Sequence, residues 1–319
     1  MTQTDEVCLT TDLQAWRGQR VLVTGGTGFL ASHLCRRLLE AGAEVHVTSR
    51  HDHVSGSESP RWWRTNLSSA EEVRSLLAEI QPSVVYHLAG SVGAKPDLSL
   101  VLPTFESLLA STIHILIGAT EFGCKRIVLS GSLTEPGPPA LHAVPSSPYA
   151  AAKWAASAYG RMFHALYQAP VVVALPFMTF GPGQNPDKLV PSVILNVLRG
   201  EVPKLSSGLW EADWIYVGDV IQGFLDAGIV PGIEGTTLEL GSGTKLAIRE
   251  IVEKIAALME TQIKPVFGAI PDRPREPVRV ADTLETKRIL GWAPTTSLSE
   301  GLQQTIQWYT KQMPAGSLR

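Results

Sequence analysis

The segment Val21-Leu-Val-Thr-Gly-Gly-Thr-Gly-Phe-Leu-Ala31 passes from an apolar run through closely spaced glycines into a second apolar run. This order predicts a buried strand, a tight turn and a helix, which together place a dinucleotide pyrophosphate on a helix N-terminus. Gly25 permits the turn, Gly28 lets the backbone approach phosphate, and Ala31 keeps the helix close to the sheet. We therefore expect a cofactor site that includes Gly25, Thr27, Gly28, Phe29 and Leu30.

Short β-branched runs alternate with longer amphipathic segments beyond this point. The strands predicted from these runs are residues 20–24, 44–49, 84–88, 126–130 and 171–175. A repeated strand and helix order is typical of the α/β class with a doubly wound parallel sheet, the Rossmann architecture. After residue 175 the chain changes to Pro/Gly-rich segments, which predict the loops of a smaller C-terminal substrate lobe.

The expected division of the chain into domains follows from this change in sequence pattern after residue 175. Residues 236–240 look like a strand that returns to the large sheet, so the lobe is expected to consist of two separate pieces. We predict a flexible N-terminal tail at 1–17, a dinucleotide-binding domain at 18–175 with a returning segment at about 213–242, and a substrate lobe made of 176–212 and 243–319.

Composition limits the possible partners of the chain. It has 319 residues, 44% of them hydrophobic and 18% charged, with a net charge of -3, so we expect a globular protein that binds no nucleic acid and no membrane. The three cysteines are too scattered for a disulfide framework, and neither they nor the eight histidines show metal-ligand spacing. No signal segment and no apolar run of membrane-spanning length is apparent. We therefore predict a cytoplasmic protein without a metal site.

The end of the second predicted strand bears on the type of cofactor. It reads Thr48-Ser49-Arg50, where an acidic residue would favour NAD and a cation would favour the 2′-phosphate of NADP. Because the guanidinium of Arg50 suits phosphate, Ser49 and Arg50 predict NADP(H), with NAD possible, although a solvated loop charge is the alternative for Arg50. The other expected cofactor contacts are Asn66 and Leu67 at the adenine, Leu88, Ala89 and Gly90 after the fourth strand, and Pro176.

The stretch Tyr149-Ala-Ala-Ala-Lys153 places a phenol and an ammonium one helical turn apart on the same face. A neighbouring ammonium lowers the pKa of a phenol, which makes Tyr149 a proton donor, and Lys153 is also expected to hold the ribose. Ser132 follows a strand at the edge where ligands bind and could anchor a carbonyl, although alone it would be only a turn serine. These three residues predict hydride and proton exchange at a carbonyl. Ser146 and Ser147 before Pro148 predict a helix cap.

With these residues in place, the sequence resembles the extended short-chain dehydrogenases/reductases, specifically the NAD(P)-dependent epimerase/dehydratase group that acts on nucleotide sugars. The resemblance covers nearly the whole chain. It rests on Thr24-Gly-Gly-Thr-Gly-Phe-Leu30, Tyr86-His-Leu-Ala-Gly90, Ser132 with Tyr149-Ala-Ala-Ala-Lys153, Phe177-Met-Thr-Phe-Gly-Pro-Gly183, Asp213-Trp-Ile-Tyr-Val-Gly-Asp219, Ala281-Asp282 and Leu290-Gly-Trp-Ala-Pro294.

The resemblance also implies which reactions are disfavoured. The 4,6-dehydratases of the group carry an Asp-Glu pair directly after the catalytic hydroxyl residue, whereas this chain has Leu133 and Thr134. Glu135 lies one residue too far along, unless a register shift brings it closer. The resemblance therefore favours an NADPH-dependent reductase of a nucleotide-linked keto-deoxysugar, with a nucleotide-sugar epimerase as the alternative. A reductase of a non-sugar carbonyl and a non-catalytic dinucleotide sensor are less favoured.

The resemblance further implies a substrate set and a partner. Substrate contacts are expected from Ser132, Leu133 and Thr134, and from Met178, Lys188 and Arg273, where Met178 replaces the asparagine of the group and Arg273 matches its diphosphate-binding arginine. A second arginine of the group is replaced by Ala212. The group also forms dimers through the helix that carries Tyr149 and the one before it, here near 103–122, so we expect a homodimer.

Overall fold

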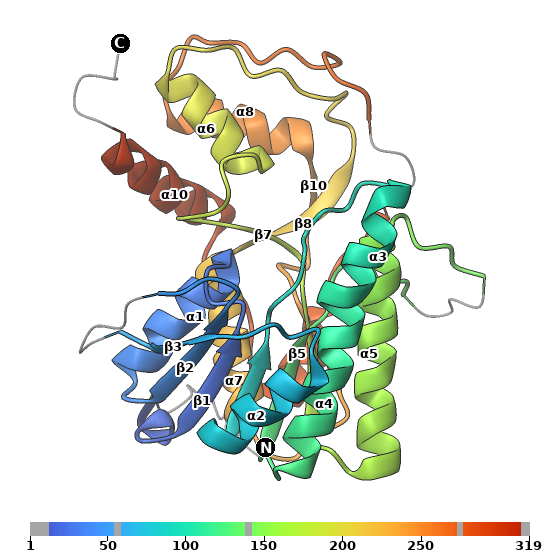
Figure 1. The fold of residues 1–319 in the computed structure, drawn as a ribbon. Helices are drawn as coiled ribbons and strands as arrows, with labels where there is room; N and C mark the ends of the chain where they lie inside the picture. The colour runs from blue at the N-terminus through green and yellow to red at the C-terminus, as the bar shows by residue number, and fades with distance from the viewer. Residues whose placement is uncertain (1–12, 54–58, 138–141, 273–276, 314–319) are drawn as a thin grey trace, which may run out of the picture.

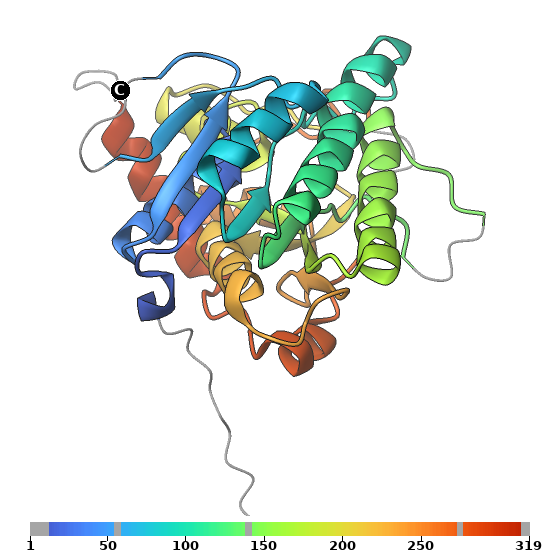
Figure 2. The ribbon, with the colours of Figure 1, turned by 60° about the horizontal axis from the view of Figure 1, so that its bottom comes forward.

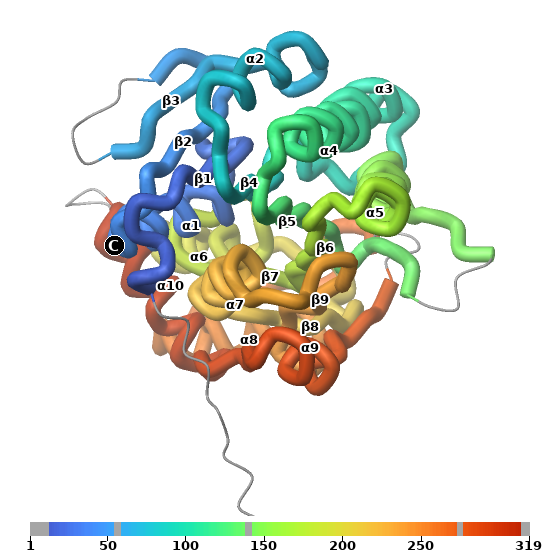
Figure 3. Tube along the Cα trace, turned by 90° about the horizontal axis from the view of Figure 1, so that it is seen from below, coloured from blue at the N-terminus to red at the C-terminus, as the bar shows by residue number. Residues whose placement is uncertain are grey.

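The computed structural model describes residues 13–53, 59–137, 142–272 and 277–313. Its centre is a sheet of seven parallel strands in the order β3-β2-β1-β4-β5-β6-β9 (Figures 1 and 3). The strands are β1 Arg20–Thr24, β2 Glu44–Ser49, β3 Arg61–Arg64, β4 Val84–His87, β5 Arg126–Ser130, β6 Val171–Pro176 and β9 Thr237–Leu240. This is the predicted doubly wound sheet. The strand order reverses between β1 and β4, and the crevice at the carboxyl ends of these strands is where such folds bind ligands.

Helices cover both faces of the sheet, and each face has its own core (Figures 2 and 3). Helices α1 (Phe29–Glu40) and α7 (Val217–Ile229) contribute to one core. Helices α2 (Ala70–Ile80), α4 (Ser111–Glu121) and α5 (Pro148–Tyr167) contribute to the other. Because both faces are covered, the central strands are almost wholly apolar, which explains why they read as short β-branched runs.

A smaller lobe stands at the carboxyl edge of the sheet. Strands β7 (Met178–Phe180), β8 (Glu211–Tyr216) and β10 (Lys245–Ala247) form a three-stranded sheet in the order β10-β8-β7. Its core also includes residues of helices α6 (Leu189–Leu198), α8 (Ile248–Leu258) and α10 (Leu298–Gln312). Since β8 pairs with β7 and β10, the segment that returns to the large sheet begins with α7 at Val217 and not at about 213.

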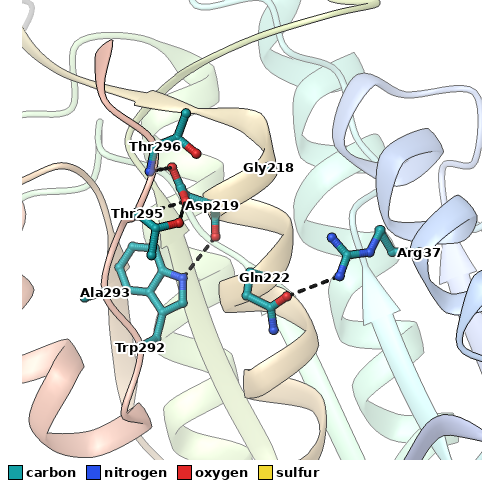
Figure 4. A pocket seen from close by; sticks show the side chains of 8 residues that line it. All are labelled: Arg37, Gly218, Asp219, Gln222, Trp292, Ala293, Thr295 and Thr296. Atoms are coloured by element: carbon teal, nitrogen blue, oxygen red, sulfur yellow. Dashed lines mark hydrogen bonds between the residues drawn. The ribbon is translucent and has the colours of Figure 1, made fainter. Parts of the chain in front are cut away.

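The lobe is joined to the large sheet at Asp219 on α7 (Figure 4). The Asp219 carboxylate accepts hydrogen bonds from the backbone N–H and hydroxyl of Thr295 and from the N–H of Thr296, and its carbonyl accepts one from the indole of Trp292. Helix α9 (Thr283–Leu290) and α10 lie on either side of this connection. Residues Arg37 and Gln222 complete the lining of a pocket of about 270 Å³ beside it.

Two expectations were wrong: the extent of the N-terminal tail and the absence of an apolar run of membrane-spanning length. Residues 13–16 form a 3-10 helix whose Trp16 is buried, with its ring centroid 6.1 Å from that of Tyr86, so the flexible tail does not extend to residue 17. In addition, Leu98–Glu121 is one helical run that, by length and composition alone, could cross a membrane. It comprises a 3-10 turn, α3 (Val101–Thr104), a π-helical stretch (Phe105–Ala110) and α4, and it packs beside α5.

Candidate functional site

The glycine turn between β1 and α1 leaves no room for a side chain. Gly25 has a φ of +74°, and a Cβ there would lie 2.8 Å from the Cα of Ala89. A Cβ on Gly26 would lie 1.8 Å from Cγ1 of Val47. The N-cap of α1 is Gly28, which offers no side chain to the first N–H groups of the helix. These backbone donors and the helix dipole therefore fit the pyrophosphate of a dinucleotide.

Thr24 connects this turn to the end of β4, a role that the sequence analysis missed. Its Oγ1 accepts hydrogen bonds from the N–H groups of Leu88 (3.1 Å) and Ala89 (3.0 Å) and lies 2.9 Å from Nδ1 of His87. Because Oγ1 already accepts two hydrogen bonds, the Thr24 hydroxyl donates its own proton to Nδ1 of His87. Burial, reinforced by the charge of Lys153, lowers the pKa of His87 to about 3, so this imidazole is neutral.

The adenosine side of the crevice contains a second cation that the sequence analysis did not predict. Arg50 and Arg64 line a pocket of about 450 Å³ together with Thr65, Asn66 and Glu72. Arg64 ends β3 and its Nη1 lies 3.2 Å from Asp52 Oδ2, where both side chains are exposed.

Leu67 and Ser49 were also expected near the cofactor, but neither lines this pocket. Leu67 packs against the core under α2 and is not part of the pocket lining. The Oγ of Ser49 accepts a hydrogen bond from the N–H of His51 and lies 3.0 Å from Nε2 of His53.

Tyr149 and Lys153 lie on the first turns of α5. The helix begins at Pro148, and the side chain of Ser147, rather than that of Ser146, caps it by accepting from the N–H of Ala150. Lys153 is buried, and its Nζ donates a hydrogen bond of 2.6 Å to the carbonyl of Ser130 at the end of β5. The start of α5 therefore places both residues near the end of β5, at the carboxyl edge of the sheet.

The electrostatics of this pair differ from the prediction. Burial raises the pKa of Tyr149, a hydrogen bond with Ser132 lowers it, and the charge of Glu135 raises it. Burial lowers the pKa of Lys153 to about 8, against the opposing effect of Glu135. The prediction of a lowered Tyr149 pKa was therefore wrong, because burial has the largest effect and raises it. The Lys153 ammonium donates to the Ser130 carbonyl.

Ser132 lies in the turn after β5, close to Tyr149. Its Oγ lies 2.9 Å from Oγ1 of Thr134 and accepts a hydrogen bond of 3.2 Å from the Thr134 N–H. Leu133 is buried in the core that includes α1 and α7. Glu135 is also buried, and its carboxylate accepts hydrogen bonds from within the fold. The turn thus presents hydroxyl groups to the crevice, and the carboxylate is not brought there.

A family model matches this chain over residues 21–228, described as the NAD dependent epimerase/dehydratase family. The chain belongs to this family. The matched region runs from β1 through α7 and so contains the glycine turn and all three predicted catalytic residues. The resemblance inferred from the motifs is confirmed.

Individual members of the epimerase/dehydratase family match nearly the whole chain. A dTDP-glucose 4,6-dehydratase from Neisseria gonorrhoeae is 28% identical, covering 91% of this chain and 95% of its own length. A UDP-glucose 4-epimerase from Mycolicibacterium smegmatis is 29% identical, covering 91% and 98%. The structure of a Thermus thermophilus UDP-glucose 4-epimerase in complex with NAD is 25% identical with a TM-score of 0.80, covering 92% and 100%. These relatives are dehydratases and epimerases, whereas the sequence analysis placed a reductase first.

The remaining predicted residues of this family member lie at the end of β6 and in the lobe. Met178 is half-buried on β7, where it packs against both the core that includes α1 and α7 and the core of the lobe. Lys188 is exposed at the N-cap of α6, and Pro176 ends β6 beside Leu240. Arg273 lies outside the described residues. Ala212 on β8 is buried in the lobe core, so this position offers no polar group to a ligand.

Proposed function

We propose that the protein is a nucleotide-sugar epimerase that oxidises one carbinol carbon and reduces the resulting carbonyl from the opposite face. The observation that carries this proposal is the turn after β5, where Ser132 is followed by Leu133 and Thr134. Neither of these side chains transfers protons near neutral pH, so eliminating water from a sugar lacks its acid and base. The dehydratases are similar in sequence, but the epimerases among the relatives agree better with this chemistry.

Three side chains would act at the reacting oxygen, and one of them would transfer the proton. Tyr149 takes the proton of the substrate hydroxyl as the carbon loses its hydride, and it returns the proton to the same oxygen when the hydride comes back. Ser132 donates a hydrogen bond to that oxygen. Lys153 would leave the Ser130 carbonyl when a ribose hydroxyl offers another partner, and only then would its ammonium stabilise the phenolate. The nicotinamide dinucleotide, when bound, accepts and returns the hydride, so no cofactor is consumed.

A reductase that consumes NADPH is the second candidate, and the adenosine pocket favours it. Arg50 and Arg64 contribute two guanidinium groups to one pocket, and this pocket would suit a 2′-phosphate if it holds the adenosine ribose. We therefore propose that the protein binds NADP(H) in preference to NAD(H). Asp52 pairs with Arg64, and Glu72 lines the same pocket as the two arginines. These carboxylates would repel a 2′-phosphate and so limit the preference for NADP(H).

Dissociation constants of NADP⁺ and NAD⁺, measured by calorimetry, test this cofactor preference. Charge-assisted hydrogen bonds contribute roughly 1.5–3 kcal/mol, so Arg64→Ala should weaken NADP⁺ binding about tenfold or more and leave NAD⁺ binding unchanged. Arg61→Ala is the matched control, because Arg61 lies on the opposite face of β3 and pairs with Glu44. Equal losses for both cofactors would refute the phosphate role of Arg64.

One assay separates the two reactions. The purified protein is incubated with UDP-glucose, UDP-galactose or a dTDP-linked 4-keto sugar, with a trace of oxidised cofactor or with stoichiometric NADPH. Conversion of one epimer into the other without net change in NADPH absorbance supports the epimerase. Stoichiometric NADPH loss with the keto sugar alone supports the reductase and overturns the first proposal. Elimination of water from the sugar would contradict both.

We also propose a homodimer formed by α5 and the helical run before it. Leu108 and Leu116 of that run are buried in the monomer, so they do not form the contact. The exposed apolar residues of these neighbouring helices are Leu98, Val101, Leu102, Phe105, Ile117, Tyr159, Leu166 and Tyr167. Sedimentation of the wild type should give a dimer, and Leu102→Glu combined with Phe105→Glu should give a monomer. A monomeric wild type would refute this.

A further inference from the structure

Glu135 holds the catalytic turn from the inside of the protein. Its side chain is 4% exposed, and Oε1 accepts hydrogen bonds from the N–H of Ser132 (2.8 Å) and from the hydroxyl of Ser157 (3.0 Å). Ser157 lies on α5, one turn beyond Lys153. A Cβ on Gly131 would lie 2.6 Å from the same oxygen, so the glycine makes room for the carboxylate. The carboxylate thereby connects the Ser132 backbone to the helix that carries Tyr149 and Lys153.

Arg279 holds the same turn from the other side. Its Nη1 donates hydrogen bonds to the carbonyls of Glu135 (2.6 Å) and Leu133 (3.5 Å), and its Nη2 pairs with the carboxylate of Glu239 on β9. The turn that carries Ser132 is therefore held between a buried carboxylate and a half-buried ion pair. Such support keeps a catalytic hydroxyl in place without using the hydroxyl itself.

Glu135 is also the acidic member of a group of buried ionisable side chains. Burial raises its pKa, against the lowering effects of Lys153 and Arg161 on α5. In return its charge raises the pKa of Lys153 and of Tyr149. The other charged groups nearby do not replace it: His87 on β4 is neutral, and Arg279 and Glu239 are paired with each other.

We propose that Glu135 is a positioning residue for the reaction, which fixes Ser132 through its backbone and supplies the negative charge opposite Lys153. It does not transfer a proton to or from substrate, because its oxygen is engaged with Ser132 N–H and Ser157 inside the fold. The proposal rests on the proposed function only in taking Lys153 and Ser132 as participants. It explains why an ammonium can stay charged in a buried position beside the phenol.

The test measures the protonation of Lys153 without any sugar, so it does not depend on the reaction proposed above. Protein labelled with ¹³C at the lysine Cε is titrated by NMR, and the Lys153 signal is assigned by its loss in Lys153→Arg. Glu135→Gln retains an oxygen that can accept from Ser132 N–H but removes the charge. The Lys153 midpoint should then fall from about 8 by about one pH unit.

Ser157→Ala is the matched control, since it removes one hydrogen bond of the carboxylate and keeps its charge. The Lys153 midpoint of this variant should equal that of the wild type. If Glu135→Gln leaves the midpoint unchanged, or if Ser157→Ala shifts it equally, the charge role is wrong. Circular dichroism and melting curves establish that each variant is folded before it is titrated.

A second readout uses turnover of whichever sugar the protein accepts. The ratio of activity at pH 8 to activity at pH 6 should be several-fold lower in Glu135→Gln than in the wild type, because Lys153 loses its proton at a lower pH. A uniform loss at all pH values would show a purely structural role and overturn the charge proposal. Absence of turnover in the wild type itself would count against the proposed function, while the NMR titration would still decide the role of Glu135.

Discussion

Replacing Lys153 by methionine is expected to abolish turnover and to stabilise the fold. Burial lowers the pKa of the ammonium from 10.5 to about 8, which corresponds to about 3.4 kcal/mol at 1.36 kcal/mol per pH unit. This is the free energy by which the fold disfavours the charged form relative to the unfolded chain. The methionine would leave the Ser130 carbonyl without its donor, which costs about 1–3 kcal/mol. The net gain at pH 7 is therefore about 0.4–2.4 kcal/mol.

The pH dependence of this gain identifies its cause. Between pH 8 and pH 10.5 the unfolded chain binds more protons at Lys153 than the folded protein does, so the free energy of unfolding of the wild type rises with pH. The Lys153→Met variant lacks this contribution, and its advantage should shrink as the pH rises from 7 to 10. Urea titrations at several pH values measure both proteins. An advantage that does not change with pH, or a variant less stable throughout, would refute the reasoning.

Three further predictions concern the glycine turn, the support of the catalytic turn and the phenol. Gly25→Ala should reduce dinucleotide affinity at least tenfold in calorimetry, because its φ is +74° and its Cβ would meet Ala89. Arg279→Met removes the cationic partner of the Glu239 carboxylate, which keeps the N–H of Asp282, and should lower the free energy of unfolding by about 1–3 kcal/mol in urea titrations. Tyr149→Phe should lower kcat by about 10²–10⁴ with little change in dinucleotide affinity, and a variant that keeps full turnover would contradict the assigned proton transfer.

The sequence was most informative where function depends on a few consecutive residues. The strand, the glycine turn and the start of α1 follow from local backbone geometry, and the spacing of Tyr149 and Lys153 follows from the helical repeat. These features are correct because neighbours along the chain determine them. The position of Leu133 and Thr134 after Ser132 could likewise be read without a structure.

Properties that depend on packing between distant segments could not be predicted. The carbonyl that holds Lys153 lies 23 residues away, and the burial that raises the pKa of Tyr149 comes from segments distant in the sequence. Glu135 was considered as a displaced acid, yet only the packing of α5 against the turn shows its side chain pointing inward. The pocket that combines Arg64 with Arg50 requires β3 to pair with β2.

The connection at Asp219 also sets an order for folding during synthesis. A ribosome that has made the chain through α7 has delivered six of the seven strands of the large sheet, yet the donors to the Asp219 carboxylate are still missing. These donors arrive only with Thr295 and Thr296, just before the last helix. In a nascent chain that stops before them, water solvates this carboxylate, so the hydrogen bonds between α7 and residues 295–296 can form only near the end of translation.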